Sequence, residues 1–335
     1  MTIPLSLLDL APIAPGSTAR ESFAGSVALA QTAERTGYTR VWYAEHHNMP
    51  TIASSATSIL IGHVAGHTST IRLGSGGIML PNHAPLTIAE QFGTLATLYP
   101  GRIDLGLGRA PGSDQTTMRA LRRDPRSADS FPQDIVELQG YLSGDSVIPG
   151  VQAVPGAGTD VPLYILGSSL FGAQLAAALG LPYAFASHFA PDALREAIAI
   201  YRRDFRPSAQ SATPHLIVAV NAIASTDAAD ATQQFETMRR SRVRSMISRG
   251  DSAPEYTDAQ IDEFLTTPQG AQLAGMMRHT AVGTPDDVRA YLEGFASETG
   301  ADELIIAHAS SELDDRLRSV ELTAAAMGLT PLVAA

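Results

Sequence analysis

The chain has 335 residues, of which 44% are hydrophobic and 17% charged, a composition typical of a globular protein with a large core. It contains no cysteine, and all 23 basic residues are arginine, so disulfides, thiol nucleophiles, iron–sulfur ligands, Schiff-base lysines and P-loop lysines are excluded. The net charge of −11 argues against nucleic acid as a partner, and no apolar run is long enough for a membrane span or a signal peptide, so we expect a cytoplasmic protein.

Short apolar runs alternate with longer amphipathic segments along the whole chain. The apolar runs predict eight strands, at 5–10, 40–44, 71–75, 103–107, 163–166, 183–186, 215–223 and 303–307. The amphipathic segments predict helices at 21–36, 54–68, 86–99, 132–142, 173–179, 191–205, 228–247 and 312–327, and Gly283-Thr284-Pro285 is a further helix start.

Eight strands, each followed by a helix, predict a parallel sheet closed into a (β/α)8 barrel, with residues 1–335 as one domain. Two longer connections, 110–126 and 250–277, predict loop excursions after the fourth and seventh strands. No G-x-G-x-x-G follows the first strand, which disfavours an open dinucleotide-binding sheet.

Functional groups in such a barrel collect in the loops after the strands. Glu45, His46 and His47 follow the second strand, where imidazoles can exchange protons or bind a polar ring, or only line a polar loop. Adjacent residues of a strand point to opposite faces, so we expect no metal site at this histidine pair. Gly76 and Gly77 indicate either a clearing for a flat ring or a simple β-bulge.

The next two strand ends carry groups suited to an anion, and the one after them carries an imidazole. Arg109 after the fourth strand can hold a phosphate or carboxylate, or form a structural salt bridge. Gly167, Ser168 and Ser169 after the fifth strand open a helix, whose free N–H groups can bind an anion, unless the serines only cap it. We expect Arg109 and this helix start to lie together at one phosphate. His188 after the sixth strand either borders the pocket or packs at the rim.

Two further groups of basic residues have simpler interpretations. His63 and His67 are four residues apart, but the glutamate of the zinc-protease motif is missing, so we expect no metal there. A cluster of four arginines predicts a solvated helix face, or else a contact surface for a second subunit or a flavin reductase: Arg239, Arg240, Arg242 and Arg244.

Several segments together, in this order, resemble the bacterial-luciferase-like flavin monooxygenases. They are VWYAEHHN at 41–48 and the segments 71–85, 99–112, 165–170, 180–189 and 283–285, and they extend the resemblance over most of the chain. The resemblance implies a luciferase-like TIM barrel that binds FMN and uses O2 to oxygenate a small organic substrate. The chain departs from luciferase at Gly108, where luciferase has a reactive cysteine, and at Gly167, where it has an acidic residue.

The resemblance also implies roles for single residues. His46 matches the acid–base group at the flavin reaction centre, and Glu45 is its supporting neighbour. Gly76 and Gly77 match a non-proline cis peptide beneath the flavin ring. Arg109 and the loop Gly167, Ser168, Ser169 match the groups that hold the FMN phosphate, and His188 would border the cofactor.

The implied partners follow from the same resemblance. Reduced FMN, loosely bound, would come from a separate flavin reductase, and a homodimer would form through the second and third helices. Two alternatives stay open: hydride transfer with the deazaflavin F420, and a flavin-binding barrel without catalysis. The sequence does not identify the substrate.

Overall fold

The computed structural model describes residues 3–110, 114–248 and 256–331. Eight parallel strands form a closed sheet, in the order β1 (Leu5–Asp9), β2 (Arg40–Tyr43), β3 (Arg72–Met79), β4 (Ile103–Gly108), β5 (Leu163–Gly167), β6 (Tyr183–Phe185), β7 (Leu216–Ala224) and β9 (Glu303–His308). Pairing of β6 with β7, and of β7 and β1 with β9, closes the sheet. The predicted (β/α)8 barrel is therefore confirmed.

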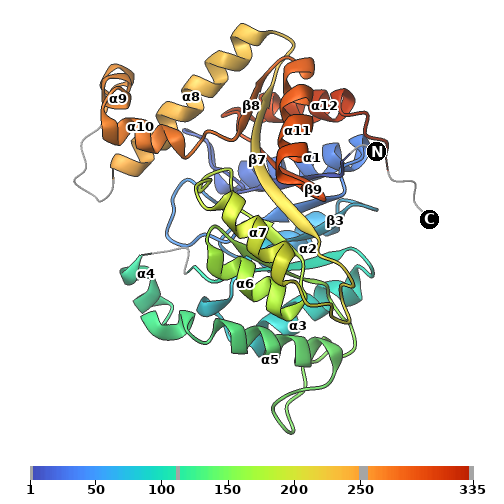
Figure 1. Ribbon diagram of the computed structural model, residues 1–335. Coiled ribbons are helices and arrows are strands. Elements are labelled where there is room, and N and C mark those ends of the chain that lie inside the picture. The colour runs from blue at the N-terminus through green and yellow to red at the C-terminus, as the bar shows by residue number, and fades with distance from the viewer. Residues whose placement is uncertain (1–2, 111–113, 249–255, 332–335) are drawn as a thin grey trace.

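Helices connect the strands and cover the outside of the sheet (Figure 1). The larger ones are α1 (Ala19–Thr36), α2 (Thr57–Ala65), α3 (Pro85–Leu98), α5 (Phe131–Ser143), α6 (Leu170–Leu179), α7 (Leu194–Asp204), α8 (Ala228–Ile247), α11 (Pro285–Thr299) and α12 (Leu313–Ala326). Shorter ones are η1 (Leu80–Asn82), α4 (Gln115–Ala120), η2 (Pro125–Ala128), α9 (Asp258–Leu265) and α10 (Pro268–Gly275). In the described parts of the chain, no helix combines the length and apolarity needed to cross a membrane.

The helix termini show why several boundaries lie where the sequence puts them. Thr18 and Glu21 form a capping box at the start of α1, and Gly37 ends that helix in the left-handed conformation. Thr284 and Asp287 form the same box at the start of α11, with Pro285 in its first turn.

The interior of the barrel is divided along its axis. Arg40 lies at the amino end of β2 and forms buried ion pairs with Asp104 (2.8 Å) and Glu303 (3.0 Å). Asp104 lies near the start of β4, and Glu303 is the first residue of β9. Above this network a small apolar cluster fills the barrel, and it includes Trp42 and Tyr164 with their rings 5.0 Å apart. The amino end of the barrel interior is thus filled by side chains, which leaves the carboxyl end of the interior for a ligand site.

The structure differs from the sequence prediction in three elements. The connection predicted as a loop at 110–126 contains α4 and the start of η2, because Asp114 and Asp124 cap these short helices. Strand β3 continues to Met79, beyond the predicted end at residue 75. A further strand, β8 (Thr280–Gly283), was missed; its four residues pair only with the carboxyl half of β7.

Figure 1 shows α4, α9 and α10 on the left side of the view, away from α1 and α12. Helix α4 follows β4 along the chain, and α9 and α10 follow β7, so these elements lie at the carboxyl ends of the strands. This is the end at which the predicted site residues lie.

Candidate active site

Glu45 lies directly after β2, and its carboxylate is buried. One oxygen accepts hydrogen bonds from Nε2 of His47 (2.7 Å) and Nε2 of His83 (2.8 Å), and the other accepts the Met79 backbone N–H (3.0 Å). Burial alone would raise the pKa of Glu45, but these donors outweigh it and lower the pKa. The Glu45 carboxylate therefore stays charged and ties the end of β2 to the end of β3.

His46 differs from His47 in its hydrogen bonding, because His47 bonds to Glu45 and Nδ1 of His46 bonds to nothing. Its Nδ1 is buried and has no hydrogen-bond partner, and burial lowers the pKa of the ring. His188, after β6, is also buried with Nδ1 unpartnered; burial, Arg242 and His46 together lower its pKa to about 3. Since β2 and β6 lie on opposite sides of the closed sheet, His46 and His188 approach the carboxyl end of the barrel from opposite sides.

The glycines of β3 are required by close contacts with neighbouring strands. The register of β3 against β4 shifts between Ser75 and Ile78, so the predicted bulge is present, and the Gly76–Gly77 peptide is cis. A Cβ on Gly76 would lie 2.9 Å from atoms of Leu8 and Trp42, and one on Gly77 would lie 2.8 Å from a backbone oxygen of β4. Packing of the barrel therefore accounts for these glycines, whether or not a flat ring also lies over them.

Arg109 and the start of α6 come together as expected. The Arg109 guanidinium carbon lies 4.2 Å from the ring centre of Phe171, in the first turn of α6. Within the described residues no carboxylate pairs with Arg109, so that part of the chain provides no structural salt bridge for it. Ser169 occupies the N-cap position without a side-chain capping bond, so the simple capping interpretation is wrong for Ser169. Exposed Ser168 and half-buried Gly167 complete this loop.

The arginine cluster of α8 is not a uniformly solvated face. Three of its members form ion pairs with acidic residues of α8 and α9: Arg239 with Glu236, Arg240 with Asp262 and Arg244 with Asp258. Arg242 instead donates to the backbone oxygen of His188 at 3.4 Å. The predicted solvated face is therefore wrong in this respect, because α9 packs against α8 and one arginine turns toward the barrel.

Glu45, His47 and His83 also have the composition of a metal site. One ligand atom from each lies within 4.8 Å of the others. Two imidazoles and a carboxylate suit transition metals, but the same three groups are already joined by hydrogen bonds to the Glu45 carboxylate. His46 and His188 are not members of this group.

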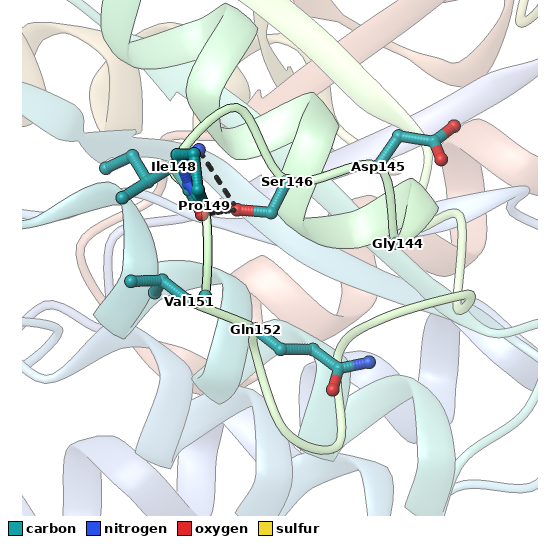
Figure 2. A pocket seen from close by; sticks show the side chains of 8 residues that line it. Gly144, Asp145, Ser146, Ile148, Pro149, Val151 and Gln152 are labelled. Carbon is teal, nitrogen blue, oxygen red and sulfur yellow. Dashed lines mark hydrogen bonds between the residues drawn. The ribbon is translucent and has the colours of Figure 1, made fainter.

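One hollow lies beside these residues, and another lies away from them. One, of about 320 Å³, is lined by Glu45 and His83 together with residues at the start of α2 and Gln91 of α3. The other, of about 570 Å³, lies in the loop between α5 and β5, at the amino ends of the strands (Figure 2). In that loop Ser146 only bonds to the backbone of Ile148, and Asp145 is the single charged lining residue, so we assign no chemistry to it.

Three polar residues of the site were missed in the sequence. His83 follows η1, a 3₁₀ turn that brings it back to Glu45. Its position shortly after the third strand is the sequence feature that could have identified it. Asn221 lies within β7, which reads as a continuous apolar run, and its amide donates to the His188 oxygen at 2.8 Å. Arg242 was grouped with its neighbours, although it lies on the apolar stripe of α8.

Comparison with known proteins identifies relatives over nearly the full chain. The model of the luciferase-like monooxygenase family matches residues 3–303. A luciferase-like monooxygenase of Escherichia coli (strain K12) is 50% identical over 323 residues, 96% of each protein. N-acetyl-S-alkylcysteine monooxygenase of Bacillus subtilis (strain 168) is 40% identical over 195 residues, 55% of this chain and 57% of that protein.

Solved structures show the same barrel. The crystal structure of apo-MsnO8 is 37% identical, with a TM-score of 0.89 over 98% of this chain and 100% of that chain. The oxygenating constituent of 3,6-diketocamphane monooxygenase from Pseudomonas putida, in complex with FMN, has a TM-score of 0.74 at 17% identity, covering 99% and 100%. An F420-dependent secondary alcohol dehydrogenase has a TM-score of 0.70 at 15% identity, covering 98% and 99%. At these low identities the last two show the fold alone.

Proposed function

Because the chain belongs to the luciferase-like monooxygenase family, we propose that it is an FMN-dependent monooxygenase that uses reduced flavin and O2 to oxygenate a small organic substrate. The observation that carries the proposal is the pairing of Arg109 with the start of α6 at the carboxyl end of the barrel. A guanidinium beside a helix N-terminus is a suitable site for a phosphate dianion.

The residues at the barrel mouth fit a flavin. Arg109 has no carboxylate partner among the described residues, and Ser169 leaves the first N–H groups of α6 free of side-chain capping. Gly76 and Gly77 add no side chains at the mouth, and the Nδ1 atoms of His46 and His188 are buried without partners. When bound, reduced flavin supplies two electrons, so that one oxygen atom of O2 enters the substrate and the other becomes water.

His46 is the residue that we assign to proton transfer. Its pKa is lowered by burial, so the ring is neutral near pH 7 and can accept a proton at Nδ1, which is buried and has no hydrogen-bond partner. Glu45 is assigned a positioning role rather than a catalytic one. Its carboxylate accepts all three of its hydrogen bonds from other groups of the protein, the rings of His47 and His83 and the backbone N–H of Met79.

The partners are part of the same proposal. A separate reductase would deliver reduced FMN, and the protein would work in the cytoplasm as a homodimer through α2 and α3. Two large apolar side chains on these helices support the dimer: Ile59 of α2 is 74% exposed, and Leu98 of α3 is 63% exposed. Analytical ultracentrifugation of the wild-type protein and of Ile59→Asp tests it, and a wild-type monomer would contradict it.

The function is tested by supplying cofactor and electrons separately. Purified protein is titrated with FMN and with F420, and turnover is measured with a flavin reductase, NADH and ¹⁸O2. N-acetyl-S-benzylcysteine is a suitable first substrate, because a relative carries the name N-acetyl-S-alkylcysteine monooxygenase. We expect FMN binding and ¹⁸O in the product. Binding of F420 alone with hydride transfer to substrate would replace the proposal, and FMN binding without any O2-dependent product would indicate a flavin-binding protein.

A further inference from the structure

One arginine near the barrel mouth lacks the acidic partner that its neighbours have. Within a stretch of six residues of α8, three arginines are neutralised by Glu236, Asp262 and Asp258, with separations such as 2.7 Å for Arg240 to Asp262. In the described part of the chain, no carboxylate lies within ion-pairing distance of Arg242. The difference follows from the side of α8 on which each arginine lies.

Arg242 belongs to the stripe of α8 that faces the protein. The buried or packed residues of the helix include Ala231, Phe235 and Met238, and Arg242 continues their spacing of three and four residues. Such a stripe normally carries apolar side chains, so a cation at this position is unusual. Burial lowers the pKa of Arg242, with no carboxylate to offset it.

Arg242 bonds to a group of buried polar residues, two of which have a further polar atom without a partner. Its Nη1 lies 3.4 Å from the His188 backbone oxygen, which also accepts from Asn221. Nδ1 of His188 and Oδ1 of Asn221 are buried without a hydrogen-bond partner, and so is Nδ1 of His46 across the mouth. His188 and His46 both have lowered pKa values, so near pH 7 the positive charge of this group is that of Arg242.

An unpaired guanidinium that has lost much of its hydration is unfavourable until an anion pairs with it. The group lies beside β6 and β7, across the barrel from His46 and apart from the proposed phosphate site at Arg109 after β4. An anion at Arg242 would therefore belong to a second molecule in the same mouth rather than to the flavin tail.

We propose that Arg242 binds an anionic end of the organic substrate, so that the substrates of this protein carry a carboxylate or a similar oxyanion. This inference rests on the proposed function, because it names the substrate class for the same site. A planar guanidinium can donate two parallel hydrogen bonds to a carboxylate, and this geometry selects acids over their neutral esters.

The test uses matched pairs of probes and variants. Carboxylic acids and their methyl esters, including N-acetyl-S-benzylcysteine, benzoic acid and butyric acid, are titrated into FMN-loaded protein and followed by saturation-transfer NMR. Arg242→Gln removes the charge, Arg242→Lys keeps it without the planar geometry, and Arg240→Gln is the control on the same helix. We expect the acids to bind the wild type and the Arg240→Gln variant in preference to the esters. Arg242→Gln should weaken acid binding by about 10- to 100-fold, as for loss of hydrogen bonds to a charged group.

Several results would overturn the inference. Equal binding of acids and esters, a preference for acids that survives in Arg242→Gln, or binding of no acid to the wild type would each do so. FMN affinity is measured in parallel. It should change by less than about twofold in Arg242→Gln, because a substitution distant from the proposed phosphate site has little effect on binding there. A large loss of FMN affinity would assign Arg242 to the flavin phosphate instead. Failure of the wild type to bind FMN would count against the proposed function, separately from the substrate charge.

Discussion

Glu45 determines the arrangement of the histidines around it. His47 and His83 both bond to its carboxylate, and this contact raises the pKa of His47 above its ordinary value. His46, between Glu45 and His47 in sequence, has no hydrogen-bond partner at Nδ1. Alternation along the strand end thus separates a structural imidazole from one that is free to react.

Replacing Glu45 by Gln tests this division. The amide keeps the size of the side chain but loses the charge and one acceptor oxygen, so unfolding should become easier by about 1–3 kcal/mol. The pKa of His47 should fall, because its largest raising cause is the bond to Glu45. Chemical denaturation and a ¹H–¹⁵N titration of the histidines measure both effects, with exposed Glu293→Gln as the control. An unchanged pKa of His47 would contradict the assignment.

The sequence predicted the positions of the candidate residues, whereas their roles remain predictions. Position after a strand was enough to place His46, Arg109 and His188 at the same end of the barrel, because a parallel barrel brings all strand ends to one face. It did not identify His83 or Arg242. The first depends on a 3₁₀ turn, and the second depends on which side of a helix faces the protein.

Among the elements, the contact between β3 and β4 requires glycine on both strands. A Cβ on Gly106 of β4 would lie 2.2 Å from the Ser75 backbone oxygen of β3 and 2.7 Å from a methyl of Leu166. For β3, the glycines Gly76 and Gly77 predict a clearing for a ligand or a bulge. The structure shows the bulge, and close strand packing is a further reason that spacing alone could not reveal.

Gly106→Ala should therefore destabilise the barrel. The backbone oxygen of Ser75 cannot move without breaking the pairing of β3, so we expect a loss of about 3 kcal/mol or more in the free energy of unfolding. Gly294→Ala in α11 is the matched control, since its Cβ would meet nothing within 4 Å, and alanine should stabilise that helix by about 0.5–1 kcal/mol. Urea unfolding compares the two variants. Equal and small effects would show that β3 and β4 can separate without cost.

At the scale of the whole molecule, the fold was predicted and its additions were not. Eight alternating strand and helix segments determined a closed barrel, because apolar strands and amphipathic helices have distinct periods. Strand β8 escaped notice because four residues that pair with half of β7 carry too little pattern. The interior also contains groups that must stay neutral, such as His308, which is buried between Tyr38 (3.1 Å) and Ser319 (2.8 Å).

The stability of the whole protein should depend on these buried histidines. Burial lowers the pKa of His308 and of His188 to about 3, whereas in the unfolded chain a histidine titrates near about 6.5. The unfolded state therefore binds more protons between these values, so stability falls as the pH drops below about 6.5. Each histidine should contribute a slope of about 1.4 kcal/mol per pH unit. Urea unfolding from pH 7 to pH 5 gives the slope of the unfolding free energy against pH. This slope should be smaller for His308→Asn than for the wild type and unchanged for exposed His63→Asn. Equal slopes for the wild type and both variants would contradict the role of buried His308.

The account depends most on a phosphate held between Arg109 and the start of α6. Comparing FMN with riboflavin, which lacks the phosphate, isolates that contact. Fluorescence titrations should show FMN binding at least about tenfold more tightly than riboflavin, the order expected for hydrogen bonds to a charged group. Arg109→Gln should remove most of this preference, while Arg119→Gln on α4 should keep it. Equal affinity of the wild type for the two flavins, or an Arg109→Gln variant that still distinguishes them as the wild type does, would contradict the proposed site.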